Sequence, residues 1–428
     1  MDFKENLSKV FLKEEVDALL EELKKEDTHA LLVNTNKVSK EDILKLFPLL
    51  TPHPYVDNAF IYDKNIYPLG KSVYHELGYF YLQDPSAMMV ASLVDIKPND
   101  RVLDMCAAPG GKTIGASLNL KETGSIISND ISFSRCKELI ENVERLGLDN
   151  IVVINNDLEQ IYHHYQNKFD VIFLDAPCSG SGMFRKEDKM MEDWSINKVY
   201  KFAELQKRLI DIAYFMLKPG GTLSYSTCSY SLEEDEEVIE HLLVHSDAQV
   251  IKLPEIKGAY INSNKPIGIR LTPLYFNGEG HYICQIRKPG KKKENQFENE
   301  NKYQKLLPEV VKNFDVIKVN ENYYALRNKE ETKYLNVLRY GKKVGYEQKG
   351  IFHFDLHFAK SLKANQFPSV ELNIEEIKKY FEGNPINKNN PYKGFVLLTH
   401  QNVGVDIAKT DGSVIKNNYP KGRRRKYQ

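Results

Sequence analysis

Short apolar runs and longer amphipathic stretches alternate along the central part of the chain. Each short run is typical of a strand, whereas the longer stretches repeat their apolar residues every three or four positions, which is typical of a helix. The predicted strands are Arg101–Met105, Ser125–Asn129, Ile151–Ile154, Asp170–Leu174 and Thr222–Ser226. Strands separated by helices in this order predict the α/β class, with a mostly parallel, doubly wound sheet.

Two of the intervening helices are defined by the residues at their ends. One is expected over Ser132–Leu146, because Ser132 can cap its first turn and Gly147 can stop its last. The other carries an apolar stripe at Phe202, Leu205, Leu209, Ile212 and Met216. The stretch Lys218-Pro219-Gly220-Gly221 is expected to end this second helix before the final strand.

The segments on either side of these strands have patterns of their own. Residues 1–70 combine a helical repeat from Leu12 to Leu23 with a short apolar run at Leu31–Asn34, which predicts a small α+β N-terminal domain. Ser39 is expected to cap the next helix of this domain. We further expect a central domain over 71–288, a polar linker over 289–305 and renewed globular structure over 306–428.

Composition narrows the class of protein further. The chain has 428 residues, of which 42% are hydrophobic, and its 59 Lys and Arg residues balance its 59 Asp and Glu residues. Since no apolar run approaches the roughly 20 residues needed to span a membrane, and the first residues lack a signal-peptide core, membrane and secreted classes are not expected. Five scattered cysteines form neither a disulfide framework nor zinc-type pairs, which favours a cytoplasmic protein without a metal. The zero net charge removes the simplest argument for nucleic-acid binding but leaves room for a local basic face.

The turn after the first predicted strand, Cys106–Thr113, is rich in small residues and glycine. Ligands bind at the carboxyl ends of the strands in a doubly wound sheet, and glycine lets the backbone approach them closely. A phosphate-binding P-loop would need glycine where Cys106 stands, and the Gly-x-Gly-x-x-Gly fingerprint of dinucleotide sites is absent. Asp130 ends the second strand 20 residues after Gly110, the spacing at which an acid meets ribose hydroxyls, and Asp157 follows the third strand. The pattern suits a nucleoside without a pyrophosphate, such as S-adenosylmethionine; a tight turn followed by two exposed acids is the alternative.

Two cysteines also follow the carboxyl ends of predicted strands. Cys178 comes after the fourth strand, close behind Asp175, and Cys228 comes after the fifth. A single cysteine is more often a small buried residue than a nucleophile, but two at neighbouring strand ends beside an acid favour chemistry. Cys136 and Cys284 lack this setting and are expected to be structural.

At these positions the chain resembles the RNA cytosine-C5 methyltransferases of the Sun/NOP type. The stretches that carry the resemblance are Gln83–Ser86, Asp104–Thr113, Asp175–Gly180 and Ser226–Ser229. Gly182–Lys186 and Gly278–Tyr282 look like the RsmF-like branch, which modifies small-subunit ribosomal RNA. Tyr380–Gly383 and Tyr419–Gly422 look like the PUA-like RNA-binding domain of that branch. One position departs from the pattern, because the family often has Arg before the Val-Asn pair of its first domain, where this chain has Leu32.

The resemblance implies a Rossmann-like class I methyltransferase sheet, a small domain over 306–365 and a β-rich PUA-like domain over 366–428. It implies methylation of cytosine carbon 5 in 16S ribosomal RNA from S-adenosylmethionine, with Cys228 as nucleophile at carbon 6, Cys178 assisting its expulsion and Asp175 holding the edge of the base. The implied cofactor contacts are Cys106 (through its backbone), Ala107, Ala108, Pro109, Gly110, Gly111, Lys112, Asp130, Asp157 and Asp175. A transfer-RNA methyltransferase on the same scaffold and a ribosomal assembly factor without catalysis are the alternatives, and the oligomeric state is open.

Other conspicuous residues have simpler interpretations. The acidic run Glu233–Glu237 is interpreted as a capping box with the first turn of a helix, and His163-His164 as a surface pair. Trp194 is compatible with base stacking and with packing. By position, Arg185 and Lys186 are better candidates for RNA contact than the basic tail Lys421–Lys426, which we also expect to meet phosphate.

Overall fold

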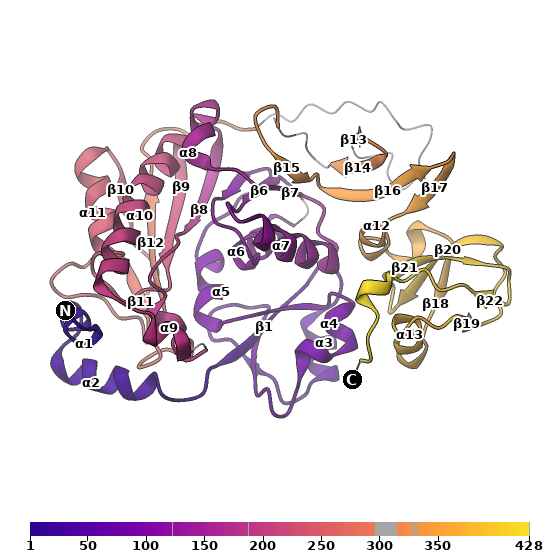
Figure 1. Cartoon of the computed structure of the whole chain (residues 1–428), viewed down its shortest axis with the longest axis horizontal. Helices are drawn as coiled ribbons and strands as arrows, with labels where there is room; N and C mark the ends of the chain where they lie inside the picture. Colours follow the sequence, from indigo (N-terminus) through magenta and orange to yellow (C-terminus); the bar gives the residue numbers. More distant parts are fainter. Residues whose placement is uncertain are drawn as a thin grey trace.

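The computed structural model describes residues 1–121, 123–186, 188–295, 315–326, 328, 330 and 332–427. Within this part of the chain the strands form an N-terminal sheet, a large central sheet and two C-terminal sheets (Figure 1). The C-terminal sheets lie at the right of the view, and helices α10 and α11 lie at the left. Residues 296–305 of the predicted linker lie outside the described residues, so the linker stays a prediction.

The N-terminal region is built on four antiparallel strands in the order β2-β3-β1-β4. They are β1 (His29–Val33), β2 (Thr51–Pro52), β3 (Ala59–Tyr62) and β4 (Phe80–Gln83), accompanied by α1 (Phe3–Leu7), α2 (Lys13–Glu22), α3 (Lys40–Leu46), η1 (Leu69–Lys71) and α4 (Val73–Glu76). Ser39 caps α3 as predicted, its hydroxyl oxygen accepting a hydrogen bond from the Asp42 N–H at 3.1 Å. Strand β4 lies beyond residue 70, so pairing in this sheet continues past the point where the pattern of the sequence places its end.

The central sheet has nine strands in the order β10-β12-β9-β8-β5-β6-β7-β15, with β11 paired to β12. They are β5 (Arg101–Asp104), β6 (Ser125–Asn129), β7 (Ile151–Ile154), β8 (Phe169–Asp175), β9 (Leu217–Thr227), β10 (Gln249–Ile251), β11 (Ile269–Leu271), β12 (His281–Arg287) and β15 (Val337–Arg339). Strands β7, β6, β5, β8 and β9 run parallel, as predicted. In the sheet, β6 and β7 lie on one side of β5, and β8 and β9 lie on its other side. The strand order therefore reverses between β5 and β8, and sheets of this kind bind ligands at the carboxyl ends of the strands at such a switch point.

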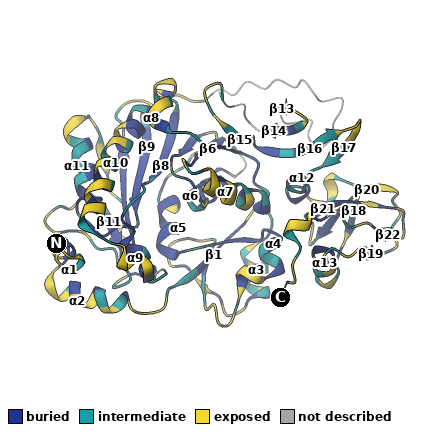
Figure 2. Ribbon diagram, viewed as in Figure 1, coloured by how far each residue is buried: buried dark blue, intermediate teal, exposed yellow. Residues whose placement is uncertain are grey.

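Helices cover both faces of the central sheet, which confirms the doubly wound class. One face packs against α5 (Pro85–Ser92), α6 (Gly111–Leu120) and α7 (Phe133–Leu146), and the other against α8 (Leu158–Ile161), η2 (Tyr162–Tyr165), α10 (Ile196–Met216) and α11 (Glu236–His245). Neighbouring residues of one strand serve the two cores: Val102 packs with the first set of helices and Leu103 with the second. The strands are accordingly buried along most of their length (Figure 2).

The C-terminal region contains two smaller sheets. The first is antiparallel and consists of β13 (Asp315–Val319), β14 (Asn322–Leu326), β16 (Lys342–Gln348) and β17 (Ile351–Phe354). The second is ordered β18-β20-β21-β22-β19 and comprises β18 (Ser369–Glu371), β19 (Ile386–Asn387), β20 (Gly394–His400), β21 (Val403–Thr410) and β22 (Val414–Ile415). The associated helices are α12 (Leu356–Lys360), η5 (Ala364–Gln366), α13 (Ile374–Phe381) and η6 (Lys421–Arg423). A β-rich C-terminal end was expected, and the strands bear it out.

Strand β15 joins this region to the central sheet. In the sequence it lies between β14 and β16, but it pairs with neither of them. It pairs antiparallel with β7 instead, with Val337 opposite Ile154 and Arg339 opposite Val153. Without it, β7 would present unpaired backbone groups at the edge of the sheet. The sheet that positions the candidate site is therefore completed by a residue range far along the chain.

Buried and half-buried ion pairs fix the C-terminal region against α4 and α7. The Glu76 carboxylate, on α4, accepts hydrogen bonds from Lys360 Nζ at 2.6 Å and from the Tyr419 hydroxyl at 2.7 Å, and all three residues are buried. On α7, Glu144 pairs with Arg339 at 2.5 Å and with Arg423 at 3.0 Å. Such pairs orient the parts that they join, because each charge is costly to bury without its partner.

Candidate active site

The turn between β5 and α6 is held against the end of β6. The Ala107 N–H donates to the Asn129 carbonyl at 2.7 Å, and the Asp130 carboxylate accepts from the Ala108 N–H at 3.3 Å. Gly110 has a φ of 121°, which side chains disfavour, and a Cβ at Gly111 would lie 2.3 Å from an atom of Gln83. The predicted cofactor residues 106–112 therefore lie together with Asp130 at the carboxyl ends of β5 and β6.

The two acids predicted to contact a nucleoside differ in their surroundings. Asp130 is buried, and its carboxylate accepts from the Ser132 N–H at 2.9 Å and lies 3.3 Å from an Arg135 nitrogen. Asp157 is half-buried and caps α8, accepting from the Glu159 N–H at 3.1 Å. Asp130 thus contacts the turn directly, whereas Asp157 is hydrogen-bonded to its own helix.

Asp104, the last residue of β5, is hydrogen-bonded to the first turn of α6. Its carboxyl accepts a hydrogen bond from the Thr113 hydroxyl at 2.7 Å, and that hydroxyl also lies 2.8 Å from the Ser128 hydroxyl. Burial raises the pKa of Asp104 to about 7. This network connects the ends of β5 and β6 to the first turn of α6, which supports the geometry of the turn above it.

Asp175 and Lys112 form a charged pair at the switch point. Lys112 Nζ lies 2.5 Å from Asp175 Oδ2, while the Ser226 hydroxyl donates to Asp175 Oδ1 at 2.7 Å. Burial alone would raise the pKa of Asp175, but the ammonium group of Lys112 lowers it below its ordinary value. The pKa of Lys112 is raised, because Asp175 outweighs the effect of burial. The pair is therefore ionised, and it joins the cofactor turn to the end of β8.

The two cysteines meet between the ends of β8 and β9. Cys178 Sγ lies 3.2 Å from Cys228 Sγ, both thiols are free, and both residues are half-buried. The hydrogen bond with Cys228 and burial raise the pKa of Cys178 well above its ordinary value. Cys136, on α7, and Cys284, on β12, are buried in the two cores beside the sheet, in agreement with a structural role.

The predicted capping box at the start of the acidic run Glu233–Glu237 is wrong, although Glu236 and Glu237 do lie in the first turn of a helix. Helix α11 begins only at Glu236, without a side-chain cap, and Glu234 is fully buried beneath the two cysteine loops. Its carboxylate accepts from the Ser179 N–H at 2.8 Å and from the Ser179 and Ser229 hydroxyls, each at 2.5 Å. One acid therefore links the residue after Cys178 to the residue after Cys228. A run of five acids, longer than a first helical turn needs, is the only signal in the sequence that could have indicated this.

Arg185, a predicted RNA contact, is instead occupied within the protein. Its side chain is 8% exposed, lies 3.6 Å from the Glu279 carboxylate and donates to the Glu26 and Gly278 carbonyls. Lys186, next along the chain, is half-buried and remains a candidate. The prediction for Arg185 fails because its guanidinium joins the loop before β1 to the segment before β12.

The remaining conspicuous residues are mostly structural. Trp194 packs edge-on against Phe3, with ring centroids 5.2 Å apart, and His164 stacks on Tyr334 at 3.7 Å. In the basic tail, Arg423 pairs with Glu144, and Arg425 lies 3.6 Å from Glu76. These arginines therefore help to hold the C-terminal region in place, and the exposed residues Lys421, Arg425 and Lys426 stay the candidates for phosphate contact.

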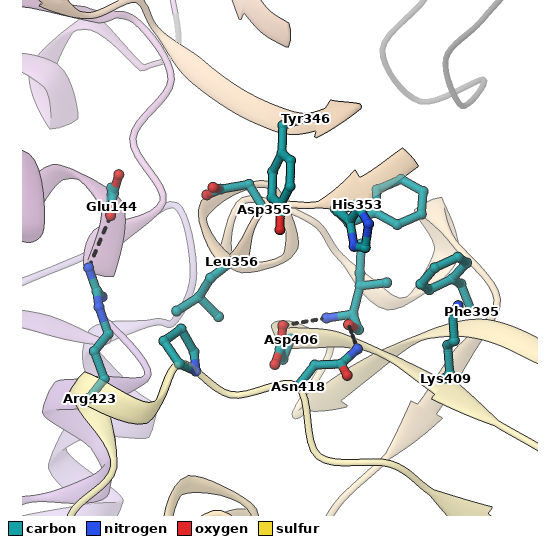
Figure 3. Close-up of a pocket in the computed structure, with 13 residues that line it drawn as sticks. Glu144, Tyr346, His353, Asp355, Leu356, Phe395, Asp406, Lys409, Asn418 and Arg423 are labelled. Carbon is teal, nitrogen blue, oxygen red and sulfur yellow. Dashed lines mark hydrogen bonds and ion pairs between the residues drawn. The ribbon is translucent and has the colours of Figure 1, made fainter. Parts of the chain in front are cut away.

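A cavity of about 490 Å³ lies between the two C-terminal sheets and α7 (Figure 3). Tyr346 and His353 stack at its upper wall with ring centroids 4.9 Å apart, and Lys409 Nζ lies 4.9 Å from the centroid of Phe395. Asp406 lies beneath them, and burial raises its pKa to about 6. These aromatic residues are half-buried, and aromatic rings beside a cation are the kind of surface on which unpaired nucleobases stack.

Two kinds of feature are absent from the described residues. No helix among them is both long and apolar enough to cross a membrane. No group of three or more His, Cys, Asp or Glu residues in this part of the chain is arranged to hold a metal ion.

Three family models match the chain, in an order that follows its regions. Residues 1–85 match the N-terminal domain of 16S rRNA methyltransferase RsmF, residues 91–287 match 16S rRNA methyltransferase RsmB/F, and residues 367–425 match the methyltransferase RsmF PUA domain. The central match contains the cofactor turn, Asp175 and both cysteines.

Curated proteins are similar to this chain over nearly its whole length. The ribosomal RNA small subunit methyltransferase F of Vibrio parahaemolyticus is 30% identical, over 92% of this chain and 90% of its own, and that of Aliivibrio salmonicida is 29% identical over the same shares. Among solved structures, a methyltransferase homologue from Pyrococcus horikoshii is 29% identical with a TM-score of 0.57, covering 66% of this chain and 93% of its own. NSun6 from Pyrococcus horikoshii with SFG shares the fold, with 23% identity, a TM-score of 0.62 and coverage of 68% and 98%. The chain therefore belongs to the RsmB/F family of 16S rRNA methyltransferases.

Proposed function

We propose that this protein transfers a methyl group from S-adenosylmethionine to carbon 5 of a cytosine in small-subunit ribosomal RNA, in the cytoplasm. The observation that carries the proposal is the pair of thiols, 3.2 Å apart, beside the ionised Asp175–Lys112 pair. A methyl transfer to an amine or a hydroxyl would have no use for two adjacent cysteines. Family membership supports ribosomal RNA as the substrate, and the two cysteines support carbon 5 of cytosine as the methylated atom.

The turn after β5 fits S-adenosylmethionine. Small residues 107–111 allow close approach, and Asp130 supplies a carboxylate at the end of the adjacent strand, where ribose hydroxyls can donate to it. When bound, the cofactor would supply an electrophilic methyl group. Asp157 is the weaker member of the proposed set, since its carboxylate caps α8.

Cys228 is the proposed nucleophile because carbon 5 of cytosine is unreactive until carbon 6 is attacked. Addition of the Cys228 thiolate to carbon 6 makes an enamine of the ring, in which carbon 5 carries the reactive electron pair. After methylation, water takes the carbon-5 proton and its electron pair re-forms the ring double bond, while the bond from sulfur to carbon 6 breaks to release the thiolate. Asp175 and Lys112 would hold the polar edge of the base during these steps.

Cys178 is the proposed assistant in the release step. Because its pKa is raised, it keeps its proton at neutral pH and can donate a hydrogen bond to Cys228 sulfur. That bond stabilises negative charge on Cys228 as it leaves carbon 6.

The proposed reaction is tested by incubating the full-length protein with S-adenosylmethionine and unmodified 16S ribosomal RNA, then sequencing after bisulfite treatment. A protected cytosine that appears only with both protein and cofactor is the expected result. Protection of transfer RNA alone would favour the transfer-RNA alternative. Binding of ribosomal RNA without any protected cytosine would favour the assembly factor.

Replacing Cys178 with alanine should trap a covalent protein–RNA species. The Cys228 adduct would still form, but its release would lose the assisting proton, so the complex should survive a denaturing gel. The double variant Cys178→Ala/Cys228→Ala is the control and should give no such band. A Cys178→Ala protein that turns over like the wild type, without the band, would contradict the release role.

The cavity between the C-terminal sheets is the proposed site for an unpaired base outside the catalytic centre. Phe395→Ala should weaken binding of ribosomal RNA by roughly tenfold, since stacking on one aromatic ring contributes about 1–3 kcal/mol. The measurement is fluorescence anisotropy at a fixed salt concentration, with Tyr200→Ala, an exposed aromatic on α10, as control. Equal affinities for the Phe395→Ala variant and the wild type would remove the cavity from the RNA path.

A further inference from the structure

His281 is buried beside the charged pair of the site, and neither the family motif nor the mechanism above assigns it a role. It is the first residue of β12, 7% exposed, with Nε2 3.4 Å from Lys112 Nζ and 3.8 Å from Asp175 Oδ1. The preceding residues are held firmly, because the Glu279 N–H donates to Asp84 at 2.9 Å and the Gly280 N–H to Ser86 at 3.2 Å. The imidazole therefore has a defined place next to Asp175.

The contact with Lys112 determines which nitrogen of His281 carries the proton. An ammonium group can only donate hydrogen bonds, so Nε2, which faces it, must accept. Burial and the charge of Lys112 lower the pKa of His281 to about 4, so the ring is neutral at physiological pH. A neutral imidazole has one N–H, which must then be at Nδ1.

This Nδ1–H is a buried donor without an acceptor among the residues that the structure describes. The other polar side chains around it are paired: Ser226 donates to Asp175, and Lys112 donates to both Asp175 and His281. A buried donor that lacks an acceptor costs about 1–3 kcal/mol and calls for an explanation. In a site for a substrate, the explanation is an acceptor that arrives with the substrate.

We propose that His281 contacts the target base, its Nδ1–H donating a hydrogen bond to the O2 carbonyl oxygen of the cytosine. The inference rests on the proposed function. Along its polar edge cytosine presents one donor, the amino group, and two acceptors, N3 and O2. Asp175 can only accept and so takes the amino end, which leaves the acceptor at the other end for a neutral donor. Negative charge spreads onto O2 as the thiolate adds to carbon 6, so this hydrogen bond strengthens in the transition state.

Two amide substitutions separate this role from a merely structural one. Asparagine places its NH2 group about where Nδ1 stands, and glutamine places its amide about where Nε2 stands. His281→Asn should therefore keep the donor to the base, whereas His281→Gln should keep an acceptor for Lys112 but lose that donor. We expect His281→Gln and His281→Phe to lose roughly 100-fold in kcat, with KM for RNA little changed, and His281→Asn to stay within about tenfold of the wild type.

A second measurement probes O2 itself. RNA transcribed with 2-thiocytidine presents sulfur, a poor acceptor, in place of O2, so the wild type should methylate it several-fold more slowly than ordinary RNA. His281→Phe has no donor to lose and should treat the two RNAs alike. Activity of His281→Gln above that of His281→Asn would overturn the proposal, because His281 would then act by holding Lys112. All three variants could prove equally slow, and the comparison of the two RNAs then decides. If His281→Phe still methylates 2-thiocytidine RNA more slowly than ordinary RNA, the proposal is overturned. If His281→Phe methylates both RNAs at the same rate, the proposal is supported.

Failure of the proposed function is distinguishable from failure of this inference. A wild-type protein that makes no 5-methylcytosine in any RNA overturns both. An active wild type whose variants follow a different order overturns only the role of His281.

Discussion

Cys228→Ala is expected to abolish methyl transfer to ribosomal RNA. Without the sulfur, carbon 5 of cytosine has no activated form, so the rate should fall by a factor of roughly 10⁴ or more. The surrounding structure should persist, because the Cys228 loop is held by Glu234 through Ser229 and by the Gly182 N–H, which donates to the Cys228 carbonyl at 2.7 Å. The measurement is incorporation of labelled methyl groups into RNA, combined with bisulfite sequencing.

Cys284→Ala provides the matched control for the nucleophile. Cys284 is fully buried on β12, the strand next to β9, directly opposite Tyr225, whereas the thiol pair lies beyond the ends of β8 and β9. Its replacement should retain methyl transfer. Binding of RNA by Cys228→Ala should match the wild type, since the side chains proposed to hold the base and the surrounding RNA are unchanged. Methylation by Cys228→Ala at the wild-type rate would refute the assignment of the nucleophile.

Glu76→Gln is expected to cause the largest loss of stability among single substitutions at the interface of the C-terminal region. The change leaves the Lys360 ammonium, which is 1% exposed, without a charged partner, and removing one member of a buried pair costs about 3–5 kcal/mol. It also weakens the acceptor of the Tyr419 hydroxyl. Urea unfolding followed by circular dichroism should show a clearly lower midpoint.

Glu375→Gln is the matched control, since Glu375 pairs with Lys378 at 3.3 Å on the surface of α13 and its side chain is 71% exposed. This substitution should change the free energy of unfolding by less than about 1 kcal/mol. Equal midpoints for Glu76→Gln and Glu375→Gln would show that the buried pair contributes nothing beyond a surface pair.

The effect of Glu76 should also depend on pH, with a definite sign. Burial alone would raise its pKa, but Lys360 and Tyr419 lower the pKa of Glu76 to about 2, against an ordinary value of 4.5. The stabilisation is therefore fully present above pH 4.5 and is lost as the pH falls toward 2. The difference in midpoint between the wild type and Glu76→Gln should shrink over that range.

The central fold was predictable because its signals are local. The strand pattern predicted β5, β6, β7 and β8 to within a residue, and Ser132 and Gly147 indicated both ends of α7. Parallel strands buried on both faces require continuous apolar runs, which are legible in a single sequence. The cysteines could likewise be placed at neighbouring strand ends by topology alone.

What the sequence could not reveal depends on partners far along the chain. Glu234 resembles a solvated acid until Ser179, from the other cysteine loop, donates to it, and Arg185 resembles an RNA contact until Glu279 pairs with it. The same holds for His281, whose significance comes from Lys112, on α6 and 169 residues earlier in the chain. In each case the chemistry of the side chain is decided by a residue that no local pattern identifies.

The pairing of β15 with β7 also bears on how the protein is made. About 180 residues separate the two strands, so the closing strand leaves the ribosome long after β7 has been synthesised. During that interval the incomplete sheet exposes a bare edge that can pair with another chain, and contacts so distant in sequence form slowly. A fragment that stops after β12 would carry every proposed catalytic residue and yet keep this edge open permanently. Aggregation, rather than loss of chemistry, is the outcome expected of such a fragment.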